Sequence, residues 1–231
     1  MSKSLESQAD SILNFYKGLN PQFKLPAGVS LMNPYRDRSS WILVESFYRK
    51  YYSDTAMRTF IFGINPGRFG GGVTGIPFTD PVRLKERCGI SHELKKLPEL
   101  SSQFIYQMID EFGGIDQFYG HFFISALCPL GFMQKGKNLN YYDSRELCNA
   151  SKPFMTDCIR KQVDTMLGSS TCICLGEGEN FNHFKKLNDK HDFFKKIVPL
   201  PHPRWIMQYR RKRLNEFVNK YVEALEAVLE K

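Results

Sequence analysis

The sequence predicts an α/β protein, built as a three-layer α/β/α sandwich whose central, mostly parallel sheet has four strands. Four short apolar runs have the length of buried strands, and amphipathic stretches with helical spacing separate them. The chain of 231 residues shows no repeat, low-complexity tract or linker. We therefore expect one domain over residues 1–231.

In the first half of the chain, apolar spacing and turn residues indicate the element boundaries. Apolar residues from Leu5 to Tyr16 recur on one helical face, and Gly18 is placed to end that helix. Residues 67–81 are so rich in glycine that we expect no regular structure there. The elements predicted in this half are helices over residues 5–16, 40–52 and 101–112 and strands over residues 59–64 and 121–127.

The second half continues the alternation of helices and strands. Gly176 ends one predicted strand, and Pro201-His202-Pro203 ends another. Ligands of parallel sheets bind beyond the carboxyl ends of the strands, so the loops at residues 65–78, 125–130 and 202–213 should converge. The elements predicted in this half are helices over residues 150–167, 180–187 and 209–229 and strands over residues 171–175 and 197–200.

The composition favours an ordinary globular protein, with 42% hydrophobic and 24% charged residues. No apolar run reaches the ~20 residues of a membrane-spanning helix, and residues 1–8 lack the layout of a secretory signal. We therefore expect a location inside the cell and no membrane partner. The six cysteines lack the spacing of a zinc or iron–sulfur site, which favours reduced, buried thiols.

The formal net charge of +8 favours a polyanionic partner, although it does not identify one. The densest basic run, Arg210-Arg211-Lys212-Arg213, follows Arg204 and the apolar residues Trp205-Ile206-Met207. Such apolar residues can wedge into a base stack while the arginines hold phosphates. The alternatives are a helix start whose apolar residues face the core, or a localisation signal.

Three residues in the predicted loops have side chains suited to a binding or reaction site. Asn65 directly follows a strand, where its amide oxygen can orient a water or cap the next turn. Phe78 can stack on a planar ligand or belong to the core. His202 lies between two prolines that hold it on a stiff backbone, as accurate placement requires; a surface histidine without a task is the alternative.

Residues 63–78, followed much later by His202-Pro203, resemble the two signature motifs of the uracil-DNA glycosylase superfamily. The similarity is greatest to the single-strand-selective monofunctional uracil-DNA glycosylases, as a divergent, bacterial-type branch. It covers about residues 30 to 225 and also includes the segments at 32–35, 128–133 and 136–139. The resemblance implies a compact α/β sandwich that needs no metal or cofactor.

The resemblance also implies roles for individual residues. Asn65 would orient the attacking water, and His202 would stabilise negative charge on the departing base. Phe78 would stack on that base, Gly67 would leave room for it, and residues 203–207 would form the wedge that enters the duplex. The implied base-binding residues are Ile64, Gly67, Phe69, Phe78 and Ser125. The implied DNA-binding residues are Pro203, Arg204, Trp205, Met207, Arg210, Arg211, Lys212 and Arg213.

The implied activity is hydrolysis of the N-glycosidic bond of uracil in DNA, which leaves an abasic site for base-excision repair. A base must leave the duplex to be reached. A deaminated base is a tolerable anionic leaving group, so the absence of Asp and Glu from both motif loops before Asp80 is compatible with this chemistry. The first motif has no lysine, so we expect no lyase activity. The expected partner is single- or double-stranded DNA, bound by a cytoplasmic, nucleoid-associated monomer.

The residues at positions 125 and 126 depart from the pattern of the family. The family places His-Asn where this chain has Ser125-Ala126, and the Asn reads the polar edge of uracil. Ala126 cannot hydrogen-bond a base, whereas the Ser125 hydroxyl can donate or accept. Because a site with fewer hydrogen bonds to its ligand is more permissive, we expect a specificity that extends to hypoxanthine or xanthine.

Two other functions remain open at this point. Ala126 favours a catalytically silent binder of damaged or single-stranded DNA, although such a binder has no need for Asn65, Phe78 and His202 together. A hydrolase of free nucleosides or nucleotides would not need the basic run at residues 210–213. Activity on oligonucleotides but not on free nucleosides separates the last possibility from the first.

Overall fold

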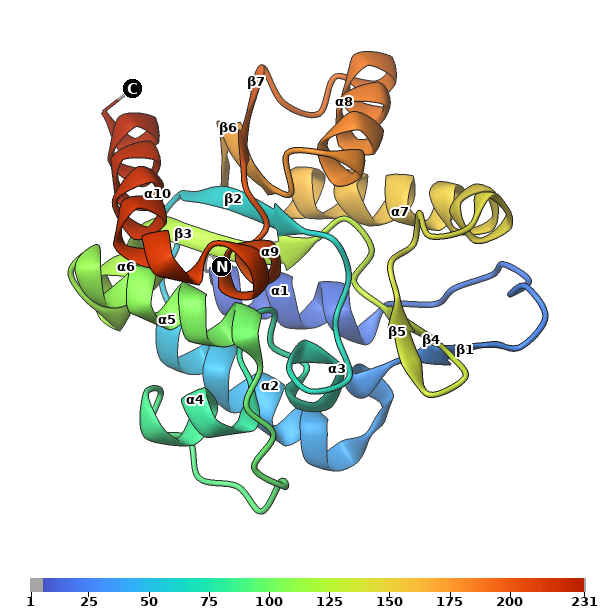
Figure 1. The fold of residues 1–231 in the computed structure, drawn as a ribbon, viewed down its shortest axis with the longest axis horizontal. Helices are drawn as coiled ribbons and strands as arrows, with labels where there is room; N and C mark the ends of the chain where they lie inside the picture. Colours follow the sequence, from blue (N-terminus) through green and yellow to red (C-terminus); the bar gives the residue numbers. More distant parts are fainter. Residues whose placement is uncertain (1–5, 231) are drawn as a thin grey trace, which may run out of the picture.

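The computed structural model describes residues 6–230, so Leu5 of the first predicted helix lies outside the described residues. A four-stranded sheet with the order β3-β2-β6-β7 occupies the centre, and every neighbouring pair in it is parallel. Its strands are β2 (Arg58–Gly63), β3 (Phe122–Ala126), β6 (Gly168–Leu175) and β7 (Lys196–Leu200). Helices flank this sheet (Figure 1), which confirms the predicted fold class.

Each of the six predicted helices overlaps a helix of the structure. The helices of the structure are α1 (Gln8–Lys17), α2 (Arg38–Tyr51), α3 (Gly71–Thr74), α4 (Pro81–Glu86), α5 (Leu100–Glu111), α6 (Ile115–His121), α7 (Arg145–Thr165), α8 (Glu179–His191), α9 (Pro203–Tyr209) and α10 (Leu214–Leu229), with the 3-10 helices η1 (Pro34–Arg36) and η2 (Arg211–Arg213). The apolar spacing found the long helices because each buries one face; α4 and α6 are too short to show a period.

Adjacent residues of β3 show which helices cover each face of the sheet. The ring of Phe123 contacts Tyr48 in α2 and Tyr52 just after it. The ring of Phe122 contacts Phe112, at the end of α5, and Phe118 in α6. Because consecutive strand residues point to opposite faces, α2 covers one face while α5 and α6 cover the other.

Three segments differ from the sequence-based prediction. The glycine-rich stretch at 67–81 contains the single helical turn α3, where we expected no regular structure. The prediction of a terminal helix over 209–229 was wrong at its start, because α9 ends at Tyr209 and α10 begins only at Leu214. The helix predicted from residue 150 begins at Arg145, because the hydroxyl of Ser144 accepts the N–H of Leu147 and caps it.

A second, antiparallel sheet was not predicted. It has the order β1-β4-β5, from β1 (Val29–Met32), β4 (Gly131–Gln134) and β5 (Lys137–Leu139). Both residues of the turn between β4 and β5, Lys135 and Gly136, have positive φ, as a type I′ hairpin turn requires. This hairpin places Asn138, whose Oδ1 accepts the backbone N–H of Arg68, beside the loop that follows β2.

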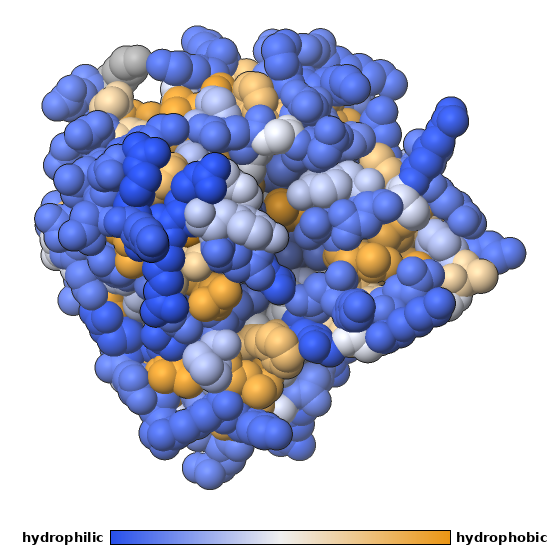
Figure 2. Space-filling model, viewed as in Figure 1, coloured by the Kyte–Doolittle hydropathy of each residue, from blue (hydrophilic) through white to orange (hydrophobic). Residues whose placement is uncertain are grey.

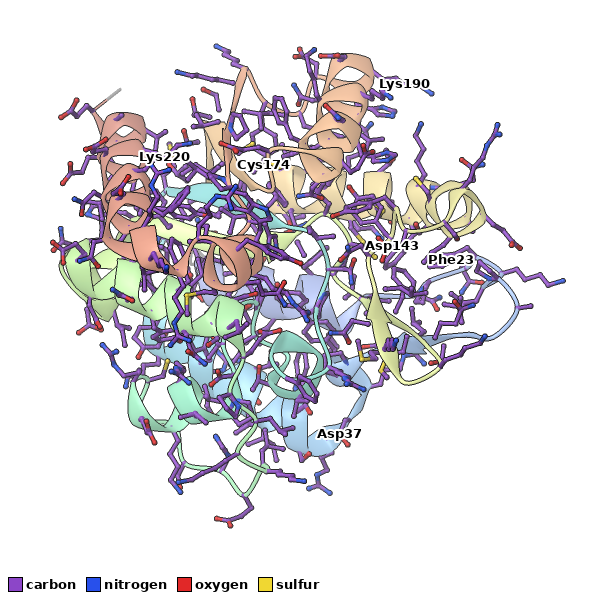
Figure 3. All side chains as sticks on the ribbon, viewed as in Figure 1. Phe23, Asp37, Asp143, Cys174, Lys190 and Lys220 are labelled. Atoms are coloured by element: carbon purple, nitrogen blue, oxygen red, sulfur yellow. The ribbon has the colours of Figure 1, made fainter. Side chains whose placement is uncertain are left out.

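The six cysteines all have free thiols, and five of them are buried. Figure 3 shows Cys174 in the interior of the molecule, on the central sheet. Between residues 6 and 230, none of the helices combines the length and the apolarity that crossing a membrane requires.

Candidate active site

A cavity of about 80 Å³ opens at the carboxyl ends of β2, β3 and β7. The three loops that the parallel sheet was predicted to bring together do meet here. Figure 2 shows the surface hollowed beside α9. The lining residues are Gly63, Ile64, Asn65, Pro66, Gly67, Gly71, Pro77, Phe78, Glu99, Ser101, Ala126, Asn138, Asn140, His202 and Arg204.

The side chain of Asn65 is held at both ends by the backbone at the end of β5 and just beyond it. Its Oδ1 accepts the N–H of Tyr141 at 3.0 Å, and its Nδ2 donates to the carbonyl of Leu139 at 3.0 Å. These two partners fix which end of the amide is oxygen. A carbonyl oxygen has two lone pairs, so Oδ1 keeps one acceptor position after bonding Tyr141.

His202 caps the N-terminus of α9 with its ring. Its Nδ1 accepts the backbone N–H of Arg204 at 3.1 Å. Burial, helped by the charge of Arg204, lowers the pKa of His202 to about 4, so the ring is neutral near pH 7. A neutral ring that accepts at Nδ1 carries its proton on Nε2. The side chain therefore brings one N–H donor and no charge to the cavity.

Phe78 forms part of the cavity wall in an unusual backbone conformation. Its φ of 54° lies in the left-handed region, which costs energy for a residue other than glycine. The ring lies over Gly63, where an added Cβ would come within 2.7 Å of Cε2. Its centroid is 5.9 Å from that of the His202 ring. A planar ligand in the cavity would therefore contact the ring of Phe78 beside His202.

Glu99 is a residue of the cavity that the sequence did not single out. It precedes α5, and its backbone N–H donates to the buried carboxylate of Asp80 at 2.8 Å. Burial and the charge of Asp80 raise the pKa of Glu99 to about 7, while Arg204 acts in the opposite direction. A Glu at the start of a helix is common, so its spacing carried no signal.

Two predicted base-binding residues do not line the cavity, which corrects the prediction. Ser125 is fully buried, and its hydroxyl has no hydrogen-bond partner among the described residues. It shares a sheet face with Phe123, whereas Ala126 points the other way, into the cavity. Phe69 is exposed at the surface, where Arg68 lies over its ring.

The predicted wedge at residues 203–207 is a regular helix, because His202 and Pro203 are favourable cap and first-turn residues. Pro203 and Met207 are buried on the face of α9 that packs against α5, which corrects their assignment to DNA contact. Trp205 is 38% exposed and carries Arg210 over its ring, 4.7 Å from the centroid.

The basic run beyond α9 is exposed along its whole length. Arg213 pairs with the carboxylate of Glu216 at 2.6 Å. Arg211 and Lys212 make no ion pair with any residue in the described part of the chain. These two side chains are therefore free to contact phosphates beside the cavity. Over residues 6–230, no cluster of three His, Cys, Asp or Glu side chains is placed to hold a metal ion.

Comparison with known proteins agrees with this geometry. Residues 49–226 match the family described as the uracil DNA glycosylase superfamily. The crystal structure of wild-type SMUG2 from Pedobacter heparinus is similar over 98% of this chain and 100% of its own, with a TM-score of 0.95 and 44% sequence identity. A search of curated proteins found no match.

Proposed function

This chain belongs to the uracil-DNA glycosylase superfamily, and on that premise we propose that it hydrolyses the N-glycosidic bond of uracil in DNA. The family match confirms the resemblance seen in the two motifs. The observation that carries the proposal is the cavity in which Asn65, Phe78 and His202 meet at the carboxyl ends of the strands. We propose that hypoxanthine and xanthine are further substrates and that the abasic product enters base-excision repair.

The proposed reaction separates an electron-poor sugar from an anionic base. A base inside a duplex is unreachable, so the target leaves the stack at a cost of a few kcal/mol and enters the cavity. There, Phe78 stacks on the ring and the Nε2–H of His202 donates to a base oxygen as negative charge develops. The free acceptor position on Asn65 Oδ1 orients a water toward the sugar carbon.

This assignment needs no protonation of the leaving base by His202. The pKa of about 4 keeps the ring neutral, so it acts as a hydrogen-bond donor and gives up no proton. Water then supplies the hydroxyl of the product sugar, and its proton neutralises the released base. No amine attacks the sugar, which leaves an intact abasic site as the product.

Labelled oligonucleotides carrying uracil, hypoxanthine or xanthine test the proposal. Each is presented with and without a complementary strand, and alkali then cuts any abasic site. We expect the uracil strand to be cleaved fastest and the strands carrying hypoxanthine or xanthine to be cleaved more slowly. In Asn65→Ala, cleavage of all three strands should be lost. DNA binding without any cleavage would overturn the proposal and favour a silent binder of damaged DNA. Hydrolysis of free deoxyuridine but not of oligonucleotides would favour a nucleoside hydrolase.

We also propose that DNA lies along α9 and the residues after it. The double variant Arg211→Ala/Lys212→Ala is expected to weaken DNA binding. It should also make the negative slope of log K against log salt shallower by about 1.4 to 1.8, since each phosphate contact contributes about 0.7 to 0.9. Fluorescence anisotropy at several salt concentrations measures both quantities.

The control for this double variant is Lys190→Ala, which removes an exposed charge at the far end of α8 (Figure 3). It lowers the net charge without touching the proposed DNA path. The double variant removes two charges and the control removes one, so a change of slope in Lys190→Ala half as large as that in the double variant would show that only net charge matters, and would contradict the assignment.

A further inference from the structure

The wall of the cavity at the end of β3 offers no side chain that can hydrogen-bond a base. Ala126 contributes only a methyl group, and the hydroxyl of Ser125 points to the opposite face of the sheet, against the core. A cavity that holds a base must satisfy the polar edge of that base, because a buried polar group without a partner is costly. Another wall must therefore supply the hydrogen bonds.

Glu99 projects into the same cavity from the start of α5. Its backbone is fixed, since its N–H donates to Asp80 and its carbonyl accepts the N–H of Gln103. Its carboxyl has no hydrogen bond or ion pair with any described residue. The carboxyl oxygens lie beside the Cα atoms of Gly67 and Gly70, in space that a Cβ at either position would occupy.

The groups around this carboxyl leave it free to bond a ligand. Asp80 lies on one side at the start of α4, and Arg204 lies across the cavity in α9. His202 is neutral, and the amide of Asn138, a residue of β5, lies beside Gly67. Between the repulsion from Asp80 and the attraction to Arg204, burial dominates, so the carboxyl takes up a proton near neutral pH.

We propose that Glu99 is a specificity-determining residue, which hydrogen-bonds the polar edge of the extruded base and so supplies the contacts that Ala126 cannot make. This rests on the proposed function. A protonated carboxyl carries one O–H donor and one carbonyl acceptor side by side. Uracil, hypoxanthine and xanthine each present a ring N–H next to a carbonyl oxygen. The O–H donates to that carbonyl while the carboxyl oxygen accepts the N–H, so one side chain satisfies the edge common to all three bases.

The two hydrogen bonds between the protonated Glu99 and the base predict that kcat/KM depends on pH, with a defined sign. The pKa of Glu99 is raised to about 7, so the protonated, competent form predominates below pH 7 and is lost as the pH rises. An ionised carboxylate only accepts, and it would repel the carbonyl oxygen of the base. In the wild type, kcat/KM should therefore fall between pH 6 and pH 8.5.

The test compares Glu99→Gln and Glu99→Ala with the control Glu93→Gln, which changes an exposed carboxyl in the connection between α4 and α5 that also carries Glu99. The amide of Gln also has a donor beside an acceptor but does not titrate. We expect Glu99→Gln to keep activity on the uracil oligonucleotide within a few-fold and to lose the decline above pH 7. We expect Glu99→Ala to lose about 10- to 100-fold in kcat/KM at pH 6.5, as the loss of two hydrogen bonds predicts. Glu93→Gln should match the wild type.

Two results would overturn the assignment. One is a wild-type pH profile retained by Glu99→Gln, which would show that another group titrates. The other is full activity of a folded Glu99→Ala, checked by its thermal unfolding. If the wild type itself cleaves no substrate, the proposed function fails and the assignment of Glu99 fails with it. If the wild type is active and the Glu99 variants match it in activity and pH profile, only the assignment of Glu99 is rejected.

Discussion

Replacing His202 with alanine is expected to lower kcat by about 10²- to 10³-fold while DNA binding stays near the wild-type value. This is the usual cost of removing one donor aimed at a developing negative charge. In the neutral ring, Nδ1 accepts the N–H of Arg204, and the Nε2–H remains available as a donor to the cavity. The donor matters most when the base departs, so the loss should fall on kcat. Single-turnover cleavage of a uracil oligonucleotide measures it.

Alanine at position 202 also removes the cap of α9, so a second variant is needed to separate the two effects. His202→Asn keeps a side-chain acceptor for the Arg204 N–H, and asparagine is a favourable cap residue. Its amide is shorter than imidazole and cannot place a donor where Nε2 lies. We expect His202→Asn to be about as slow as His202→Ala but as stable as the wild type. Wild-type activity in His202→Asn would show that the ring acts only as a cap.

The sign of the pKa shift adds a second expectation for His202. Because its pKa is lowered to about 4, the ring stays neutral down to pH 5, and His202 should cause no acidic loss of activity between pH 7 and pH 5. The unfolded chain takes up that proton near pH 6.5, so this histidine makes the fold less stable as the pH falls below 6.5.

The main sheet could be predicted because parallel strands covered on both faces appear in the sequence as short, continuous apolar runs. All six residues of β2 are buried, as the run at 59–64 suggested. The sheet of β1, β4 and β5 gave no such signal. Its strands have three or four residues, several of them half-exposed, and they exist through pairing between distant segments. Local periodicity does not report such pairing.

The candidate site likewise contains residues that the sequence could place and residues that it could not. Asn65 and His202 each lie two residues beyond the end of a strand, so strand direction alone predicted that they would lie together. Of the neighbours Ser125 and Ala126, only one can face the cavity, and the choice depends on the register of β3, where a shift of one residue exchanges the faces. Glu99 enters from the start of α5, and its position depends on a bond to Asp80, 19 residues earlier.

Replacing Asn65 with alanine is expected to lower kcat by at least about 10²-fold, because the change removes the acceptor that orients the attacking water. It should also loosen the backbone after β5, since one amide bonds both Leu139 and Tyr141. Single-turnover cleavage measures the first effect. Hydrogen exchange of the Tyr141 amide measures the second, and it should become faster in the variant.

Asn65→Asp separates the two contributions. A carboxylate still accepts the N–H of Tyr141 and can still accept from a water, but it has no donor for the carbonyl of Leu139. We expect slow exchange at Tyr141 and activity between those of alanine and the wild type. If Asn65→Ala cleaves within about threefold of the wild type, Asn65 only clamps the loop, and another group must orient the water. If both variants are inactive while only the alanine loosens Tyr141, the amide Nδ2 is also required, because its bond to Leu139 sets the direction in which Oδ1 presents its free lone pair.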